Sequence, residues 1–252
     1  MRRIVLVRAI IVLAIPVFIV GNAPAAPIGI NLVGNDPNDD DKVGPAEAGL
    51  KPQTNWNDLY WQGSNLTDAD GNATAVDVAI STSELAFNGW VPIPVGTVPG
   101  NNLLMRGYLH NEGSAWTITL SGLDSEYDSE GYDLVVYYDG ANGSSEWITE
   151  YAVACGGTTL ESIYARDETD TVAWDGSFVE AVGTNADDAT DGNYVRFTGL
   201  TANSLTLTAT PVDFQSGDAP INGLQVLPAP EPATLGLLAA GLATTFLRRR
   251  RR

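Results

Sequence analysis

The sequence predicts an all-β fold, a single antiparallel β-sandwich. Short apolar runs alternate with polar residues at every second position, as expected for strands with one face in a core and the other in water. The 26 glycines and 14 prolines fall mostly between these runs, where they favour turns. No sustained 3.6-residue apolar stripe occurs between the two ends of the chain. Many short strands separated by turns are typical of sandwiches and barrels.

Each expected strand has its own signal. Residues 116–121 (WTITLS) show strict alternation, with threonines and a serine on one face. Residues 132–140 form a β-branched and aromatic run that closes on Asp-Gly, a turn signal. The prolines of 91–100 exclude a central strand there. In chain order the strands are expected at 28–33, 73–80, 102–109, 116–121, 132–140, 147–154, 193–200, 204–210 and 221–227.

The N-terminus has the three-part pattern of a secretory signal peptide. Arg2, Arg3 and Arg8 precede an apolar run at 9–20. The small residues Ala-Pro-Ala follow it and end at Ala25. A permanent membrane span needs about 20 apolar residues, so this run is short for one. Cleavage is therefore expected after Ala25; the alternative is an uncleaved N-terminal anchor.

The charge distribution describes an anionic exported body. Nearly all 31 acidic residues lie between the two termini, whereas eight of the 13 basic residues lie in the terminal segments. This balance argues against nucleic-acid binding through phosphates and suits an extracellular protein that attracts divalent cations. Cys155 is the lone cysteine, and the chain has one histidine. With no zinc cluster and no hydrolase motif, no catalytic residues are expected, and the protein is predicted not to be an enzyme.

One acidic loop has two interpretations. Asp36, Asn38 and Asp40 follow each other at every second position, and Glu47 lies eleven residues after Asp36. This spacing partly resembles a calcium-binding loop, but Asp41 stands at the sixth position, where the sharp turn normally needs glycine. The alternatives are a structural calcium site and a solvated acidic loop. The DADGN sequence at 68–72 is also calcium-like, although a hairpin turn is expected there.

Six phrases occur together in one order along the body. They are IGINLVG (28–34), PQTNWNDL (52–59), LLMRGYL (103–109), LSGLDSEYDSEGYDLVVYYDG (120–140), GNYVRFTGL (192–200) and APINGLQVL (219–227). Together they resemble the jelly-roll domain of exported bacterial proteins of planctomycete type. The resemblance implies a galactose-binding-like β-sandwich, a fold shared by many carbohydrate-binding modules, and it assigns no residue a role.

The C-terminus resembles a PEP-CTERM sorting signal. The triplet Pro230, Glu231 and Pro232 precedes an uncharged, helix-capable stretch at 233–247. The chain then ends in five basic residues, Arg248, Arg249, Arg250, Arg251 and Arg252. The resemblance implies processing by an exosortase-type sorting enzyme.

Physical chemistry agrees with a membrane role for this tail. Fifteen helical residues rise about 22 Å, and flanking residues, snorkelling arginines and local thinning make up the remainder of a hydrocarbon core of about 30 Å. The arginines favour the cytoplasmic side, so the body lies outside the inner membrane. The expected organisation is a signal peptide at 1–25, a β-sandwich at 26–227 and a sorting signal at 228–252, which acts as a transient inner-membrane anchor.

The molecular activity that fits best is noncatalytic binding of an extracellular polysaccharide, at the cell surface or in the matrix. Two alternatives stay open: a structural matrix protein without a defined ligand, and a small polysaccharide-active enzyme. Sugars stack on exposed aromatic rings, and Trp147 and Trp174 lie near polar turns. Trp56 is expected to plug one end of the sandwich, with a sugar platform as the alternative.

The tail predicts a shortened mature chain. Protein recovered from the cell surface is expected to lack residues 233–252, because the Pro-Glu-Pro segment stays extended and accessible to a sorting enzyme. Mass spectrometry of surface material measures this directly. Mature chains that keep Ala233 to Arg252 would contradict removal.

Overall fold

The structure is a computed structural model, and it describes residues 25–34, 41–82, 84–87, 100–111, 113–123, 127, 131–141, 146–167, 174, 176–212 and 217–229. Several sequence-based predictions fall outside this part of the chain. They are the signal peptide up to residue 24, three residues of the acidic loop (Asp36, Asn38 and Asp40), the Pro230-Glu231-Pro232 triplet, the expected helix at 233–247 and the arginines at 248–252. Within the described ranges, no helix is both long enough and apolar enough to cross a membrane.

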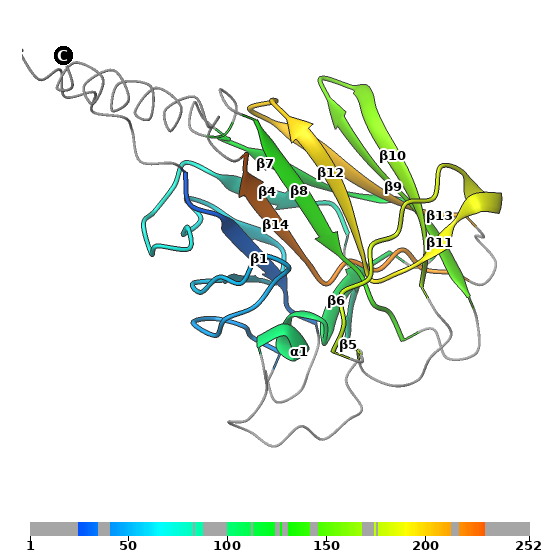
Figure 1. Ribbon diagram of the computed structural model, residues 1–252, viewed down its shortest axis with the longest axis horizontal. Helices are drawn as coiled ribbons and strands as arrows, with labels where there is room; N and C mark the ends of the chain where they lie inside the picture. Colours follow the sequence, from blue (N-terminus) through cyan, green and yellow to red (C-terminus); the bar gives the residue numbers. More distant parts are fainter. Residues whose placement is uncertain are drawn as a thin grey trace, which may run out of the picture.

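Two β-sheets pack face to face (Figure 1). The first has the order β12-β8-β14-β1-β2, from β1 (Ile28–Leu32), β2 (Asn57–Leu59), β8 (Tyr132–Tyr137), β12 (Tyr194–Leu200) and β14 (Gly223–Pro228). The second has the order β11-β10-β9-β13-β7-β4-β3, from β3 (Gln62–Gly63), β4 (Asp77–Ile80), β7 (Trp116–Ser121), β9 (Trp147–Cys155), β10 (Thr158–Asp167), β11 (Thr190–Asp191) and β13 (Leu205–Pro211).

Smaller elements complete the described fold. They are β5 (Glu84–Phe87) paired with β6 (Gly107–His110), the helix α1 (Gly100–Leu104) and the 3₁₀ turn η1 (Ala186–Asp188). Most strand pairs are antiparallel; β1 with β2 and β10 with β11 are parallel. The predicted antiparallel β-sandwich is confirmed.

The main core lies between the two sheets and follows the sequence alternation. In β7, Ile118 and Leu120 are fully buried, and in β13 Leu207 is fully buried. The threonines between them point away from the core, and Thr119 pairs with Thr206 across the two strands. Period-two patterning therefore places one apolar and one polar face on this sheet, as expected from the pleat.

The five-stranded sheet differs because it is covered on both faces. β1 is buried along its whole length. A second core lies on the outer face of this sheet and includes Trp56, Leu104, Tyr137 and Tyr194. Gly29 of β1 allows the contact: a Cβ there would lie 2.6 Å from the Trp56 ring. Trp56 is 5% exposed, which excludes the sugar platform. It packs on the outer face of this sheet, however, and not at the end of the sandwich where the sequence predicted a plug.

One expected strand is only partly correct. The segment 102–109 forms the end of α1 followed by β6. Leu104 and Met105 are adjacent and both buried, which a strand with one core face does not accommodate. A helical turn does, and the Met105 N–H donates to the Asn101 carbonyl at 3.1 Å.

The core assignment predicts that two neighbouring substitutions on β13 lower the free energy of unfolding by different amounts. Leu207→Ala is expected to lower the free energy of unfolding by about 2–5 kcal/mol, because it removes a fully buried side chain from the main core. The matched control Thr208→Ala, on the outer face of the same strand, is expected to change it by about 0.5 kcal/mol or less. Urea denaturation measures both; similar costs would contradict the assignment of faces.

Candidate functional site

Tyr60 and Trp61 are the two most exposed aromatic side chains in the described part of the chain, at 39% and 40%. They lie between β2, at the edge of the five-stranded sheet, and β3, at the edge of the seven-stranded sheet. We call this pair the aromatic edge. Exposed Tyr and Trp rings offer a flat apolar surface together with a polar tip. A ligand that stacks needs such a flat apolar surface.

The backbone before the aromatic edge is held firmly. The Val33 N–H donates to the Leu59 carbonyl at 2.9 Å. The Asp58 carboxylate accepts from Asn31 Nδ2 at 2.8 Å and from the Val43 and Gly44 N–H groups at 2.9 and 3.0 Å. Burial raises the pKa of Asp58, while these hydrogen bonds act to lower it. The aromatic edge is thus attached to an ordered backbone, and binding there costs little further ordering.

Polar groups surround the aromatic edge. The Lys42 ammonium lies 5.7 Å from the centre of the Tyr60 ring, a cation–π distance. Gln62, Ser64 and Asn65 follow the pair and are exposed. An aromatic plane with a cation over it, followed in the chain by exposed amide and hydroxyl side chains, offers both an apolar surface and hydrogen-bonding groups.

The aromatic candidates named from the sequence have different environments. Trp147 is 9% exposed and covers Gly140, where a Cβ would lie 2.5 Å from its ring. Trp174 is half-buried. The aromatic edge was not predicted from the sequence, because Tyr60 and Trp61 belong to no alternating run. The available signal was two adjacent aromatic residues followed by the polar turn QGSN.

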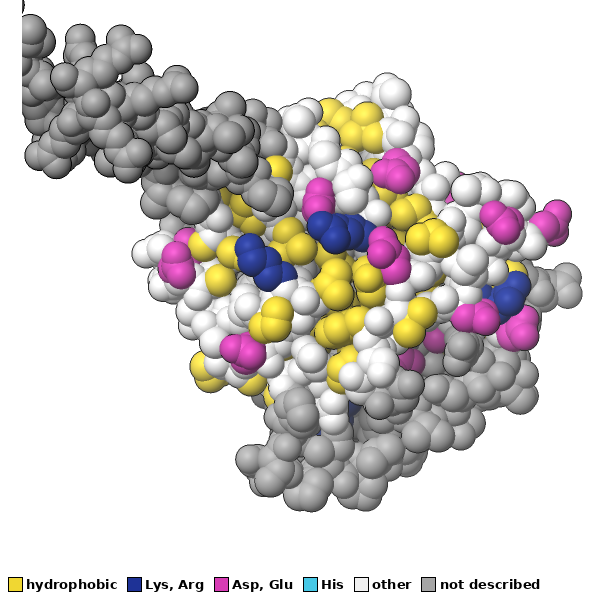
Figure 2. All heavy atoms as spheres, in the orientation of Figure 1, with side chains coloured by type: hydrophobic (Ala, Val, Ile, Leu, Met, Phe, Trp, Pro, Cys, Tyr) yellow, Lys and Arg dark blue, Asp and Glu magenta, His cyan; other side chains and the backbone are white. Residues whose placement is uncertain are grey.

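Trp174 belongs to an aromatic cluster on the outer face of the five-stranded sheet. Its ring lies 5.0 Å from that of Phe178, and Phe178 lies 5.3 Å from Tyr137 and 6.3 Å from Tyr194. Trp174 Nε1 donates to the Ser177 carbonyl at 3.0 Å. In the view of Figure 2, hydrophobic side chains gather over β8, β12 and β14, with basic side chains among them and acidic side chains around them.

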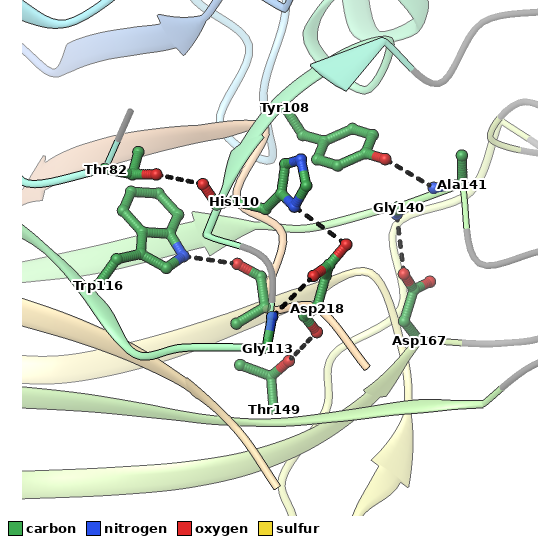
Figure 3. A network of polar contacts seen from close by, with 11 residues as sticks. Thr82, Tyr108, His110, Gly113, Trp116, Gly140, Ala141, Thr149, Asp167 and Asp218 are labelled. Carbon is green, nitrogen blue, oxygen red and sulfur yellow. Dashed lines mark hydrogen bonds and ion pairs between the residues drawn. The ribbon is translucent and has the colours of Figure 1, made fainter. Parts of the chain in front are cut away.

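A polar network closes one end of the sandwich (Figure 3). His110 Nδ1 lies 3.0 Å from Asp218 Oδ2. The segment after Asp218 is bound by two side chains of the seven-stranded sheet: Trp116 Nε1 donates to the Ala219 carbonyl at 2.8 Å, and the Tyr151 hydroxyl donates to the Pro220 carbonyl at 2.6 Å. This network therefore fixes the chain that enters β14.

Burial controls ionisation around this network. It raises the pKa of Tyr108, whose ring lies 5.5 Å from that of His110, to about 12. Burial also acts to raise the pKa of Asp218, but the hydrogen bond and charge of His110, with the Gly113 N–H, outweigh it, so this pKa lies below its ordinary value. Asp218 is thus held as a carboxylate that stabilises the fold.

No group of three or more His, Cys, Asp or Glu side chains within the described ranges is arranged to hold a metal. Glu47 of the predicted calcium loop is exposed, and Asp41 is buried, with its Oδ2 accepting from the Gly34 N–H at 2.8 Å. At 68–72, Asp68 Oδ1 accepts from the Asp70 and Asn72 N–H groups at 3.0 and 2.8 Å. This is the expected hairpin turn, closed by its own carboxylate.

The C-terminal pattern decides how the chain is sorted, because residues 228–252 match the model of the PEP-CTERM protein-sorting motif. The protein carries a PEP-CTERM sorting signal. This motif directs export and sorting toward the cell surface, and it is the feature that an exosortase recognises. No curated protein sequence matches the chain.

Three solved structures resemble this chain distantly. A family 35 carbohydrate-binding module from Clostridium thermocellum has 13% identity and a TM-score of 0.32, over 60% of this chain and 88% of that one. The CBM35 from Cellvibrio japonicus Abf62 has 11% identity and a TM-score of 0.31, over 60% and 92%. The ANX2 ectodomain from Arabidopsis thaliana has 12% identity and a TM-score of 0.39, over 81% of this chain and 42% of that one.

The end network predicts a pH-dependent stability. Asp218→Asn is expected to lower the free energy of unfolding by about 1–3 kcal/mol at about pH 6. The folded pKa of Asp218 lies below its unfolded value. The contribution of Asp218 is therefore full above the unfolded pKa of about 3.9 and disappears as the pH falls through the folded pKa.

Urea denaturation between about pH 2 and 6 tests this, because the gap between wild type and variant is expected to close at the acid end. Asp70→Asn, at an exposed position, is the control and is expected to show no such gap. A gap that stays constant down to about pH 2 would contradict the assignment.

Proposed function

We propose that this protein is a noncatalytic polysaccharide-binding protein of the cell surface or extracellular matrix, and that the aromatic edge is its binding site. The observation that carries this proposal is the exposure of two consecutive aromatic residues, Tyr60 and Trp61, on a backbone held by Asp58. A side chain that is well ordered and still exposed loses little entropy when a ligand stacks on it.

The sorting signal supports this proposal by placing the body where polysaccharides are found. In the proposed route, the tail is a transient inner-membrane anchor with its arginines in the cytoplasm, and the sandwich reaches the surface after an exosortase acts on the Pro-Glu-Pro segment. The body is anionic, so a structural calcium ion remains part of the proposal, at the predicted loop of Asp36, Asn38, Asp40 and Glu47.

The aromatic edge predicts two loss-of-binding variants. Tyr60→Ala and Trp61→Ala are each expected to weaken binding to the polysaccharide found on a glycan array by about 10- to 100-fold, as for aromatic side chains at the centre of an interface. Both are expected to leave the free energy of unfolding within about 0.5 kcal/mol of wild type, because exposed side chains contribute little to stability.

The matched control is Leu160→Ala, which removes an apolar side chain that is 51% exposed on β10. This variant is expected to bind like wild type. If Tyr60→Ala and Trp61→Ala each bind the glycan on the array as tightly as wild type, the binding site lies elsewhere. Absence of binding to every glycan, with and without calcium, would favour the structural matrix protein, and turnover of a bound glycan would favour the enzyme.

A further inference from the structure

The two ends of the β-sandwich domain leave the molecule side by side. Ile28 of β1 pairs with Val226 of β14, so the start of β1 and the end of β14 are neighbours (Figure 1). The segment before β1 is held by the Tyr127 hydroxyl, which donates to the Ala26 carbonyl at 2.7 Å. Both connections to the terminal segments therefore lie at the same end of the sandwich.

β14 continues into the sorting motif without a linker. Pro228 pairs with Tyr132 of β8, and the Ala229 N–H donates to the Gly131 carbonyl at 2.9 Å. The next residue is Pro230, which opens the Pro-Glu-Pro triplet. Because consecutive Cα atoms are about 3.8 Å apart, any protein that binds the triplet also comes within reach of the sandwich.

The loop that follows β12 lies beside this connection. Leu200 pairs with Tyr132, and the Tyr132 hydroxyl donates to the Ala202 carbonyl at 2.8 Å. Thr201 is exposed, and its Cγ2 would lie 3.8 Å from a Cβ placed on Gly131. We call the residues at this end of the molecule the sorting end: 25–28, 131–132, 199–203 and 226–229.

Little chain separates the sorting end from the proposed membrane anchor. Only residues 230–232 lie between Ala229 and the apolar stretch at 233–247. Three residues span at most about 11 Å when fully extended, and the headgroup region is itself about 5–8 Å thick on each side of the hydrocarbon core. In the proposed route the sorting end therefore faces the membrane, and an enzyme that reaches the triplet there contacts the sandwich as well.

The composition of the sorting end suits contact with a protein better than contact with lipid. None of its residues is charged, and the adjoining segment 124–130 carries four acidic residues. The large apolar side chains that are exposed in the described part of the chain all lie outside the sorting end. Basic clusters and interfacial aromatic side chains are the features that attach a surface to lipid headgroups, and the sorting end offers neither in exposed form.

We propose that the sorting end is a docking surface for the exosortase-type sorting enzyme, which contacts the loop at Thr201 while it acts on the triplet. This docking rests on the proposed sorting route and is independent of polysaccharide binding. A docked surface at a fixed distance from the triplet raises the effective concentration of the triplet at the enzyme. The aromatic edge lies toward the opposite end of β1, because Leu59 pairs with Leu32, so a polysaccharide and the enzyme do not compete for one surface.

Processing of the full-length chain tests this docking in cells that also produce the sorting enzyme. Pulse–chase labelling measures how fast the chain is shortened, and urea denaturation checks that each variant is folded. Thr201→Arg and Thr201→Glu are each expected to slow shortening by about fivefold or more, because either side chain disturbs the docked surface. Thr184→Arg is the matched control: it is exposed and lies near Tyr194, at the other end of β12, and it is expected to be shortened like wild type.

A spacer variant separates docking from simple crowding. A flexible Gly-Ser-Gly-Ser-Gly-Ser segment is inserted between Ala229 and Pro230 of the otherwise unchanged chain. We expect shortening to slow by about threefold or more, because the triplet no longer lies at a fixed distance from the docked surface. Faster shortening would mean that the sandwich only obstructs the enzyme, and an unchanged rate would mean that it plays no part; either result would refute docking.

The Thr201 variants and the wild type provide further outcomes that refute docking. If both variants are shortened as fast as wild type, docking is refuted and the sorting route stays intact. If Thr201→Arg speeds shortening while Thr201→Glu slows it, the sorting end lies on anionic lipid and not on the enzyme. A wild-type chain that is never shortened would refute the sorting route together with docking, and the glycan array would still decide polysaccharide binding separately.

Discussion

The packing of Trp56 on Gly29 is the contact on which the candidate surface depends. Because β1 has no side chain at this position, the indole ring lies directly on the strand and the segment before β2 stays close to the outer face of the sheet. Gln225 holds the same segment, since it bonds to Lys51, Gln53 and the Tyr137 hydroxyl. The position of Asp58, and of the aromatic edge after it, follows from this arrangement.

The two cores have different roles in this molecule. The core between the sheets holds the sandwich together and leaves a threonine-rich outer face on the seven-stranded sheet. The second core lies on the opposite face of the five-stranded sheet, where loops pack against it. It carries Trp174 and Phe178 at one end and leads to the aromatic edge at the other. The features that suit a ligand thus gather on the side where loops replace a plain sheet surface.

Sequence patterns predicted the sandwich because strand periodicity is a local property. In β7, β9 and β13 one face is buried and the other is solvated, and the alternation is visible in the letters themselves. The prediction failed in part at 102–109, where Leu104 and Met105 are both buried and two cores are in reach. The burial of Trp56 and the hairpin at Asp68 agreed with expectation, since a bulky ring among polar neighbours and an Asx turn are also local signals.

The sequence by itself determined the sorting signal and the all-β class, because both depend on residues that are neighbours along the chain. The tertiary structure alone decided which aromatic rings are exposed. Tyr60 and Trp61 differ from Trp56 and Trp147 in burial, although all four lie near polar residues. Exposure arises from strand order and loop packing between residues far apart in the chain, such as Lys51 and Gln225 at a separation of 174 positions, and a local pattern does not determine it.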